Sequence, residues 1–272
     1  MRTLRLLLAY DGTAYQGFGI QPAAPTIQGV LERALAETLA EPVRVTAGGR
    51  TDSGVHAQGQ VVSLRTTSRL AVDAVRRATN ARLPDDILVR DVAEAPEGFD
   101  ARRSALWRRY RYTLWREAEP NLWWRRYSYH LAAPLDLPAM RRASRRLLGR
   151  HDFAAFATHR SQASRSASTV RTVYRVAWRR DGGFWHCEVV ADAFLRHMVR
   201  SIVGTLLMVG RGEIDPPAVS AILRRGDRRL AGPTVPAHGL TLMEIAYPPG
   251  PGAGARGETG ADLFAAQGRY RI

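Results

Sequence analysis

The sequence predicts an α+β fold made of two ferredoxin-like α/β halves, each with an antiparallel sheet. Three observations support this prediction. Residues 3–93 give the order strand, helix, strand, strand, helix, strand, which is the ferredoxin-like pattern. A similar order of elements starts again at residue 105. A strong hairpin signal, Asp181-Gly182-Gly183, separates two strand-like runs of the second half.

The first half, residues 1–104, begins with an apolar strand and an amphipathic helix. Thr26 is the predicted N-cap of this helix, and the apolar residues that follow fall on one helical face. A Gly-rich loop then separates two strands. The predicted elements are a strand at 3–10, a helix at 26–40, strands at 43–47 and 60–66, a helix at 72–82 and a strand at 86–93.

The second half, residues 105–247, follows a similar order without repeating the residues. Asp136 is the predicted N-cap of its first helix, and Gly149 is predicted to end that helix. The predicted elements are a strand at 105–115, a helix at 136–148, strands at 171–180 and 184–191, helices at 194–209 and 216–225 and a strand at 240–247.

Two segments are predicted to lack regular structure. Residues 157–169 are small, polar and basic, so we expect a mobile loop that becomes ordered on RNA. The Pro/Gly-rich stretch 248–262 predicts a disordered tail over 248–272.

The charge balance favours a polyanionic partner. The chain has 272 residues, with 40 basic and 25 acidic side chains and a net charge of +15, and every basic residue is Arg. Neutralised phosphates release counterions, so such an excess favours nucleic acid. A GC-rich genome would explain the choice of Arg over Lys but not the excess of charge. The absence of Lys excludes Schiff-base and Walker A lysines.

Other classes of protein are excluded by what the chain lacks. The single cysteine, Cys187, rules out an intramolecular disulfide and a cysteine-cluster zinc site, and it suits a cytoplasmic location. The apolar run Leu4–Tyr10 is too short for a signal peptide, and no run approaches transmembrane length. We therefore expect no membrane association.

The loop GGRTDSGVHAQGQ (48–60) is the densest signal for a functional site. Its four glycines allow tight turns or a close approach to a ligand, and it contains Arg50, Asp52 and His56. From spacing alone, an Asp in such a loop is more often a turn former that bonds its own backbone.

The predicted helix FLRHMVRSIVGTLLMV (194–209) is apolar on nearly all sides and carries Arg200 in its middle. A buried Arg needs a carboxylate partner, because an unpaired buried charge is costly. One interpretation pairs Arg200 with Asp52 and keeps that carboxylate ionised. The alternative is that Arg200 extends to the surface.

The strand WRRYRYTLW (107–115) interleaves Arg with aromatic residues. Such a pattern suits phosphate contact combined with base stacking. It is equally typical of a strand with one core face and one solvated basic face. Further basic clusters, at 123–126 and 141–146, are either solvated surfaces or part of an RNA-binding surface.

Five collinear segments carry a family resemblance that covers residues 3–247: YDGTAYQGFGIQ (10–21), GRTDSGVHAQGQ (49–60), FDARRSALWRRYRY (99–112), AFLRHMVRSIVGTLL (193–207) and HGLTL (238–242). They resemble the tRNA pseudouridine synthases that act on positions 38 to 40 of the anticodon arm. The loop at 49–60 is the most specific. The resemblance implies two similar halves that flank a central RNA-binding cleft, a homodimer, and the tRNA anticodon stem-loop as partner.

The resemblance also implies roles for single residues. Asp52 matches the essential aspartate, and Arg200 matches the basic residue paired with it. Tyr110 matches the tyrosine that contacts the target base, Arg50 the arginine thought to assist base flipping, and Leu240 an apolar residue of the pocket.

His56, in the Asp52 loop, is a further candidate for binding substrate. One departure lies in the first motif, where the family continues Gly-Trp-Gln. Here the chain reads Gly17-Phe18-Gly19, which keeps an aromatic surface but not the polar side chain after it.

The implied reaction breaks the N1–C1′ glycosidic bond, turns the uracil and forms a C5–C1′ bond. Nothing is oxidised or hydrolysed, so we expect no cofactor and no metal. The base must leave the stack to be reached. Ionised Asp52 would attack the sugar or the ring, or abstract a proton, and the sequence does not choose between these routes.

Two other functions compete with this interpretation. A non-catalytic RNA-binding protein would explain the charge and the aromatic residues, but not an Arg inside an apolar helix or the loop at 49–60. An aspartic protease would use Asp52-Ser53-Gly54, but it needs two such carboxylates and the chain has one triplet, so each copy of a homodimer would have to supply one.

Overall fold

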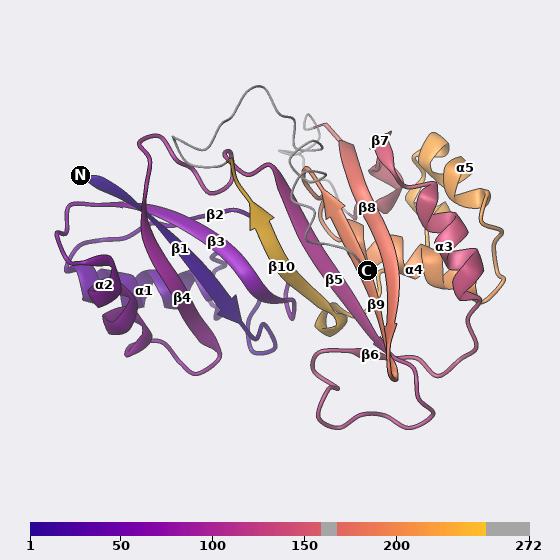
Figure 1. Ribbon diagram of the computed structural model, residues 1–272, viewed down its shortest axis with the longest axis horizontal. Helices are drawn as coiled ribbons and strands as arrows, with labels where there is room; N and C mark the ends of the chain where they lie inside the picture. Colours follow the sequence, from indigo (N-terminus) through magenta and orange to yellow (C-terminus); the bar gives the residue numbers. More distant parts are fainter. Residues whose placement is uncertain (159–167, 249–272) are drawn as a thin grey trace. The chain divides into compact units, whose positions relative to one another are not determined.

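The computed structural model describes residues 1–158 and 168–248 and divides the chain into two units (Figure 1). The first unit is Met1–Arg108 together with the strand that begins at Thr241, and the second is Arg109–Leu240. Most of the predicted mobile loop at 157–169, and nearly all of the predicted tail at 248–272, lie outside the described residues.

The first unit has the ferredoxin-like topology. Its strands β1 (Arg2–Tyr10), β2 (Thr46–Ala47), β3 (His56–Thr66) and β4 (Ile87–Ala95) lie in the order β4-β1-β3, with β2 paired to β3. All these pairs are antiparallel. The final strand, β10 (Leu240–Ala246), runs parallel to the start of β3 through Thr241 and Leu242.

Two helices lie together on one face of this sheet, α1 (Ile27–Leu39) and α2 (Val72–Asn80) (Figure 1). Thr26 is the N-cap of α1, as predicted, and its hydroxyl accepts a hydrogen bond from the Gly29 amide at 3.2 Å. Alternate residues of β1 are buried, and the helices contribute further apolar side chains to the same core: Leu4, Leu6, Leu8, Leu31, Leu35 and Val75.

The second unit has a sheet with the order β5-β9-β8-β7. Its strands are β5 (Trp107–Trp115), β7 (Gly149–Asp152), β8 (Val170–Asp181) and β9 (Phe184–Ala191), and the short β6 (Tyr129–His130) pairs in parallel with the end of β5. The predicted hairpin is confirmed. Asp181 pairs with Phe184 across a two-residue turn in which Gly182 has a φ of 56°.

Three helices accompany this sheet: α3 (Leu137–Arg145), α4 (Met198–Gly210) and α5 (Ala218–Arg225). Short 3₁₀ turns lie at Ala154–Phe156, Arg228–Leu230 and Ala237–Gly239. Asp136 caps α3 as predicted and accepts from the Ala139 amide at 2.8 Å. However, α3 ends at Arg145, and Gly149 opens β7 instead of ending the helix.

The helix predicted at 194–209 begins four residues later than expected. His197 adopts a left-handed φ of 62° and stands as the N-cap of α4. Arg200 therefore lies in the first turn of this helix and not in its middle. The prediction that the helix is mostly buried is confirmed, since only Arg200 and Met208 of Met198–Gly210 are partly exposed.

The compact units differ from the linear halves 1–104 and 105–247. The difference lies at the end of the chain, because the strand from Thr241 belongs to the first unit, where Thr241 and Leu242 pair with β3. Among the described residues, no helix combines the length and apolar character needed to cross a bilayer.

Candidate active site

The Gly-rich loop that joins β2 to β3 carries Arg50 and Asp52. The Arg50 side chain is exposed, and Asp52 is partly exposed. A turn follows Asp52, in which the Val55 amide donates to the Asp52 carbonyl at 3.1 Å and Gly54 has a φ of 75°. The loop therefore presents a cation and a carboxylate two residues apart.

Buried side chains anchor the loop on both sides of Arg50. The Gln60 amide donates to the Gly49 carbonyl at 2.5 Å, and the Gly49 amide donates back to Gln60 Oε1 at 3.3 Å. The Tyr10 hydroxyl lies 2.9 Å from Thr51 Oγ1. The same Tyr10 hydroxyl accepts a hydrogen bond from Gln60 Nε2 at 3.3 Å. Burial raises the pKa of Tyr10 to about 12, so its hydroxyl is neutral at physiological pH.

Arg108 anchors the start of the same loop. Its buried guanidinium donates to the Gly48 carbonyl from Nε at 3.1 Å and from Nη2 at 2.9 Å, and Nη2 also donates to the Arg102 carbonyl at 2.8 Å. Backbone carbonyl oxygens thus accept the hydrogen bonds of this buried guanidinium, as a buried charge requires. Arg108 is a positioning residue that the sequence did not reveal.

Residues 12–18 pack directly on the backbone of the loop. The Phe18 amide donates to the Thr51 carbonyl at 3.0 Å. Gly17 has a φ of 88°, and a Cβ there would lie 2.7 Å from the Thr51 carbonyl oxygen and 3.2 Å from the Asp52 carbonyl carbon. A Cβ on Gly12 would overlap the Val55 carbonyl oxygen. Gly12 and Gly17 have no Cβ, which lets the backbone of the first motif lie against the loop backbone on either side of Asp52.

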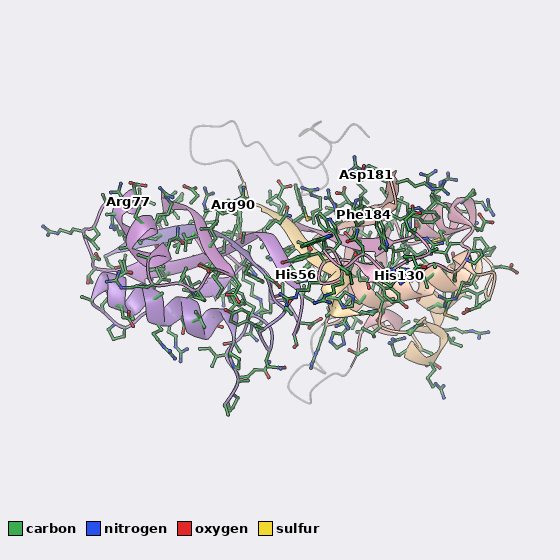
Figure 2. All side chains as sticks on the ribbon, turned by 90° about the horizontal axis from the view of Figure 1, so that it is seen from below. His56, Arg77, Arg90, His130, Asp181 and Phe184 are labelled. Atoms are coloured by element: carbon green, nitrogen blue, oxygen red, sulfur yellow. The ribbon has the colours of Figure 1, made fainter. Side chains whose placement is uncertain are left out.

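His56, labelled in Figure 2, is the first residue of β3. Its side chain is 4% exposed, and Nδ1 lies 3.1 Å from both the Gly12 amide nitrogen and Asp11 Oδ1. The imidazole is therefore packed between the first motif and β3. A side chain placed in this way supports the loop, and its predicted contact with substrate stays a prediction.

Tyr110, Arg200 and Leu240 belong to the second unit. Tyr110 is buried on β5, and its ring meets Phe194 edge-on, with centroids 5.1 Å apart and planes at 87°. Arg200 Nε donates to the Val235 carbonyl at 2.7 Å. A cation in the first turn of a helix opposes the helix dipole, and this hydrogen bond offsets part of that cost.

The segment 235–240 is fixed by Arg200 and Tyr112 together. The Tyr112 hydroxyl donates to the Pro236 carbonyl at 2.9 Å, and a Cβ on Gly239 would lie 2.6 Å from the Tyr112 ring. Burial raises the pKa of Tyr112, and the charge of Arg200 partly counters that rise. Leu240 follows this segment and is buried.

The Arg residues of β5 are less available than the sequence indicated. Arg109 Nη1 and Arg111 Nη2 lie 3.1 Å and 2.8 Å from Glu188 Oε1 on β9. Burial raises the pKa of Glu188, but the hydrogen bond from Arg111 and the nearby guanidinium charges outweigh it and leave the pKa below its usual value. Two of the Arg side chains on β5 are therefore paired with a carboxylate of the same unit.

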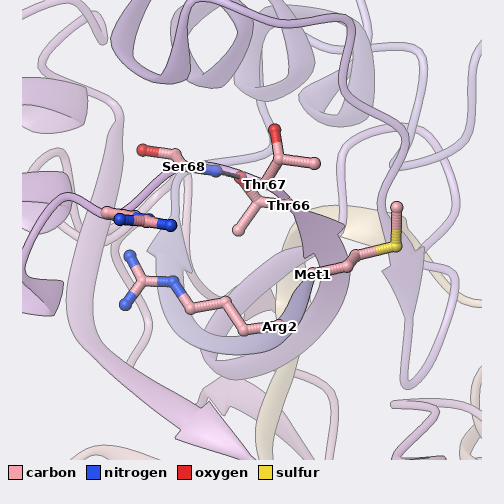
Figure 3. Close-up of a pocket in the computed structure, with 6 residues that line it drawn as sticks. Met1, Arg2, Thr66, Thr67 and Ser68 are labelled. Atoms are coloured by element: carbon pink, nitrogen blue, oxygen red, sulfur yellow. Dashed lines mark hydrogen bonds between the residues drawn. The ribbon is translucent and has the colours of Figure 1, made fainter.

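The structure therefore groups the predicted site residues by unit. Arg50, Asp52 and His56 share one loop of the first unit, whereas Tyr110, Arg200 and Leu240 lie in the second. A separate pocket of about 250 Å³ contains none of them (Figure 3). It is lined by Met1, Arg2, Thr66, Thr67, Ser68 and Arg69.

The polar groups of that pocket are largely engaged already. Arg2 donates to Glu94 and to the Leu70 carbonyl, and the hydroxyls of Thr66 and Thr67 donate to Glu41. Among the described residues, no group of His, Cys, Asp or Glu side chains has the arrangement of a metal site.

The α+β fold and the anchored Asp52 loop can be set against known proteins. A family model described as tRNA pseudouridine synthase matches residues 7–102 and 143–248. The chain is 48% identical over 257 residues to a tRNA pseudouridine synthase A of Chloroflexus aurantiacus, covering 92% of this chain and 90% of that protein.

Other relatives give the same result. The chain is 43% identical to a tRNA pseudouridine synthase A of Moorella thermoacetica, covering 91% of this chain and all of that protein. It is 43% identical to that of Geobacillus kaustophilus, covering 90% and 94%. The chain belongs to the tRNA pseudouridine synthase family.

Proposed function

We propose that this protein converts uridine to pseudouridine at positions 38, 39 and 40 of the tRNA anticodon stem-loop, with Asp52 as its catalytic carboxylate. Membership of the family supports the reaction and the tRNA substrate. The observation that carries the assignment to Asp52 is the anchoring of its loop. Gly48, Gly49 and Thr51 are each held by a buried side chain, while Asp52 itself stays accessible.

The reaction balances within the nucleotide. The N1–C1′ bond breaks, the uracil turns, C5 bonds to C1′, and C5 loses a proton while N1 gains one. An ionised carboxylate is suited to the attack or to the proton transfer, provided that its position is fixed. A loop that does not rearrange during the reaction supplies that fixed position.

The remaining residues serve the flipped base in this proposal. Arg50 helps to hold the target nucleotide out of the stack, since extrusion costs a few kcal/mol. Tyr110 and Leu240 contact the base, and Arg200 is the basic residue that the resemblance pairs with Asp52. His56 supports the loop from behind. We also propose that the enzyme is a cytoplasmic homodimer, as the resemblance implies.

The test is a reaction on an unmodified tRNA transcript without cofactor or metal, with pseudouridine mapped by carbodiimide labelling and primer extension. Wild type should modify the anticodon stem-loop, and Asp52→Asn should leave no signal while binding tRNA as wild type does. Asp91→Asn, an exposed aspartate on β4, is the matched control and should stay active.

Two outcomes would contradict the proposal. If wild type binds tRNA tightly but leaves its uridines unchanged, the protein is a non-catalytic RNA-binding member of the family. If Asp52→Asn keeps its activity, the catalytic carboxylate lies elsewhere.

A further inference from the structure

The connection from β5 to β6 is a long loop that projects beyond the strands (Figure 1). Its residues Asn121–Tyr127, here called the 121–127 loop, expose large apolar side chains. Trp123 is 89% exposed, Leu122 72% and Trp124 49%. Large apolar side chains that gather at one exposed place mark an interaction site more often than chance, and Trp is prominent among them.

The backbone of the loop is held in a defined turn. Asn121 Oδ1 accepts from the amides of Trp123 and Trp124, each at 3.0 Å. The Trp124 carbonyl accepts from the Tyr127 amide and from the Ser128 hydroxyl, each at 2.8 Å. Hydrogen bonds at both ends therefore fix the loop before any partner arrives, which reduces the entropy lost on binding.

Aromatic contacts hold Trp124 in place, whereas Trp123 is exposed. Trp124 meets Phe184 at 5.3 Å and Tyr127 at 6.2 Å between ring centroids, and Phe184 also packs on Trp115 at 4.6 Å. Phe184 lies beside Asp181 at the end of the β8–β9 hairpin (Figure 2). Trp124 thus anchors the loop to the hairpin, and Trp123 stays almost fully exposed.

The charge beside Trp123 indicates the partner. Arg125 and Arg126 are exposed and make no hydrogen bond or ion pair within the described part of the chain. Arg109 and Arg111, by contrast, are paired with Glu188. Two available guanidinium groups next to an exposed indole suit a polyanion with stackable bases, because the cations meet phosphates and the ring meets an unpaired base.

We propose that the 121–127 loop is a tRNA contact separate from the Asp52 loop, with Trp123 stacking on an unpaired base and Arg125 and Arg126 on adjacent phosphates. This inference rests on tRNA being the substrate. The loop contributes to tRNA affinity and not to the chemical step.

The experiment measures tRNA binding by filter retention and turnover by pseudouridine formation, with the full-length protein. Trp123→Ala should weaken the Kd for tRNA about tenfold, and Trp123→Phe should restore most of it, because any aromatic ring can stack. At saturating tRNA, the kcat of both variants should equal that of wild type. Leu148→Ala, an exposed apolar residue elsewhere in the unit, controls for loss of surface area.

The Arg residues are tested through salt dependence. Arg125→Gln with Arg126→Gln should reduce the slope of log K against log salt by about 1.5, since each phosphate contact adds about 0.7–0.9. Arg224→Gln with Arg225→Gln, exposed on α5, makes the same change in net charge. An equal effect of that control would assign the change to net charge and overturn the proposal.

Other results separate this inference from its alternatives. Variants that bind tRNA like wild type overturn the loop contact while leaving the proposed reaction intact. Loss of self-association in Trp123→Ala, seen by sedimentation with tRNA affinity unchanged, would make the loop an interface between two copies. A wild-type protein that binds tRNA through Trp123 but forms no pseudouridine would sink the proposed reaction and keep the contact.

Discussion

Side chains from three strands fix the loop that carries Arg50 and Asp52. Tyr10 comes from β1, Gln60 from β3 and Arg108 from β5. The glycines of the first motif allow the two backbones to touch. Single substitutions at these positions should therefore affect catalysis without touching the catalytic residue.

Gly17→Ala should lower kcat about 10- to 100-fold, because the new Cβ would lie 2.7 Å from the Thr51 carbonyl and push the Asp52 backbone away. Gly98→Ala is the matched control. Gly98 has a similar φ of 79°, but no atom lies within 4 Å of a Cβ there. Both variants share the backbone strain, so equal kcat values would refute the role of the contact. Turnover at saturating tRNA is the measurement.

Tyr10→Phe should reduce the free energy of unfolding by about 1–2 kcal/mol, since it leaves the buried groups of Thr51 and Gln60 without their shared partner. It should also lower kcat with little change in KM. Tyr15→Phe removes a comparable hydroxyl, bonded to Asp86 at 2.5 Å, and serves as the control. A parallel loss of kcat in both variants would mean that stability, and not loop position, is being measured.

At the scale of elements, the sequence predicted most helices and strands from periodicity and caps. Thr26 and Asp136 act as N-caps where expected, and the Gly182-Gly183 turn closes the expected hairpin. The start of α4 was missed because Phe194 and Leu195 fit the apolar periodicity of the helix that follows. The left-handed backbone of His197, which nothing in its residue type announces, sets the boundary.

The sequence predicted the part of the site that forms a contiguous motif. It did not predict the part that depends on tertiary contacts between distant residues. The loop at 49–60 pointed to Asp52, but the role of Arg108 depends on a tertiary contact of its guanidinium with the Gly48 carbonyl. Gln60 did carry a signal, since it is a polar residue before an apolar run, yet its two bonds to Gly49 are a matter of tertiary structure. Short strands such as β6 and β7 have too few residues for a period to show.

The pairing of β5 with β9 gives a pH-dependent prediction. Because the pKa of Glu188 is lowered in the folded state, its stabilising effect is present above the unfolded pKa of about 4.3 and lost as pH falls through the folded pKa. Glu188→Gln should therefore destabilise the protein at neutral pH, and the difference from wild type should shrink below about pH 4.

Urea unfolding of both proteins from about pH 3 to pH 7 measures that difference. Glu97→Gln, in an exposed turn, is the control and should leave stability unchanged at every pH. A Glu188→Gln difference that stays constant with pH would show that the lost packing, and not the charge, is responsible.

At the scale of the whole molecule, the net charge of +15 is a surplus that its own carboxylates do not neutralise. Some Arg residues are committed inside the protein, such as Arg108 on carbonyls and Arg111 on Glu188. Others, such as Arg125 and Arg126, are exposed. A genome bias towards Arg predicts no particular division between these groups, whereas RNA binding requires the exposed ones.

The salt dependence of tRNA binding decides between those explanations. If the exposed Arg residues contact about six phosphates, log K should fall with log salt at a slope of about −5, a loss near 10³-fold between about 50 and 200 mM salt. The measurement is a Kd series by filter retention, with thermal unfolding at each salt concentration as the control for intact folding. A slope near zero with an intact fold would mean that the surplus charge reflects codon usage and that tRNA is held by neutral contacts. A steep slope that survives Asp52→Asn would assign the charge to binding and leave the carboxylate to the chemistry.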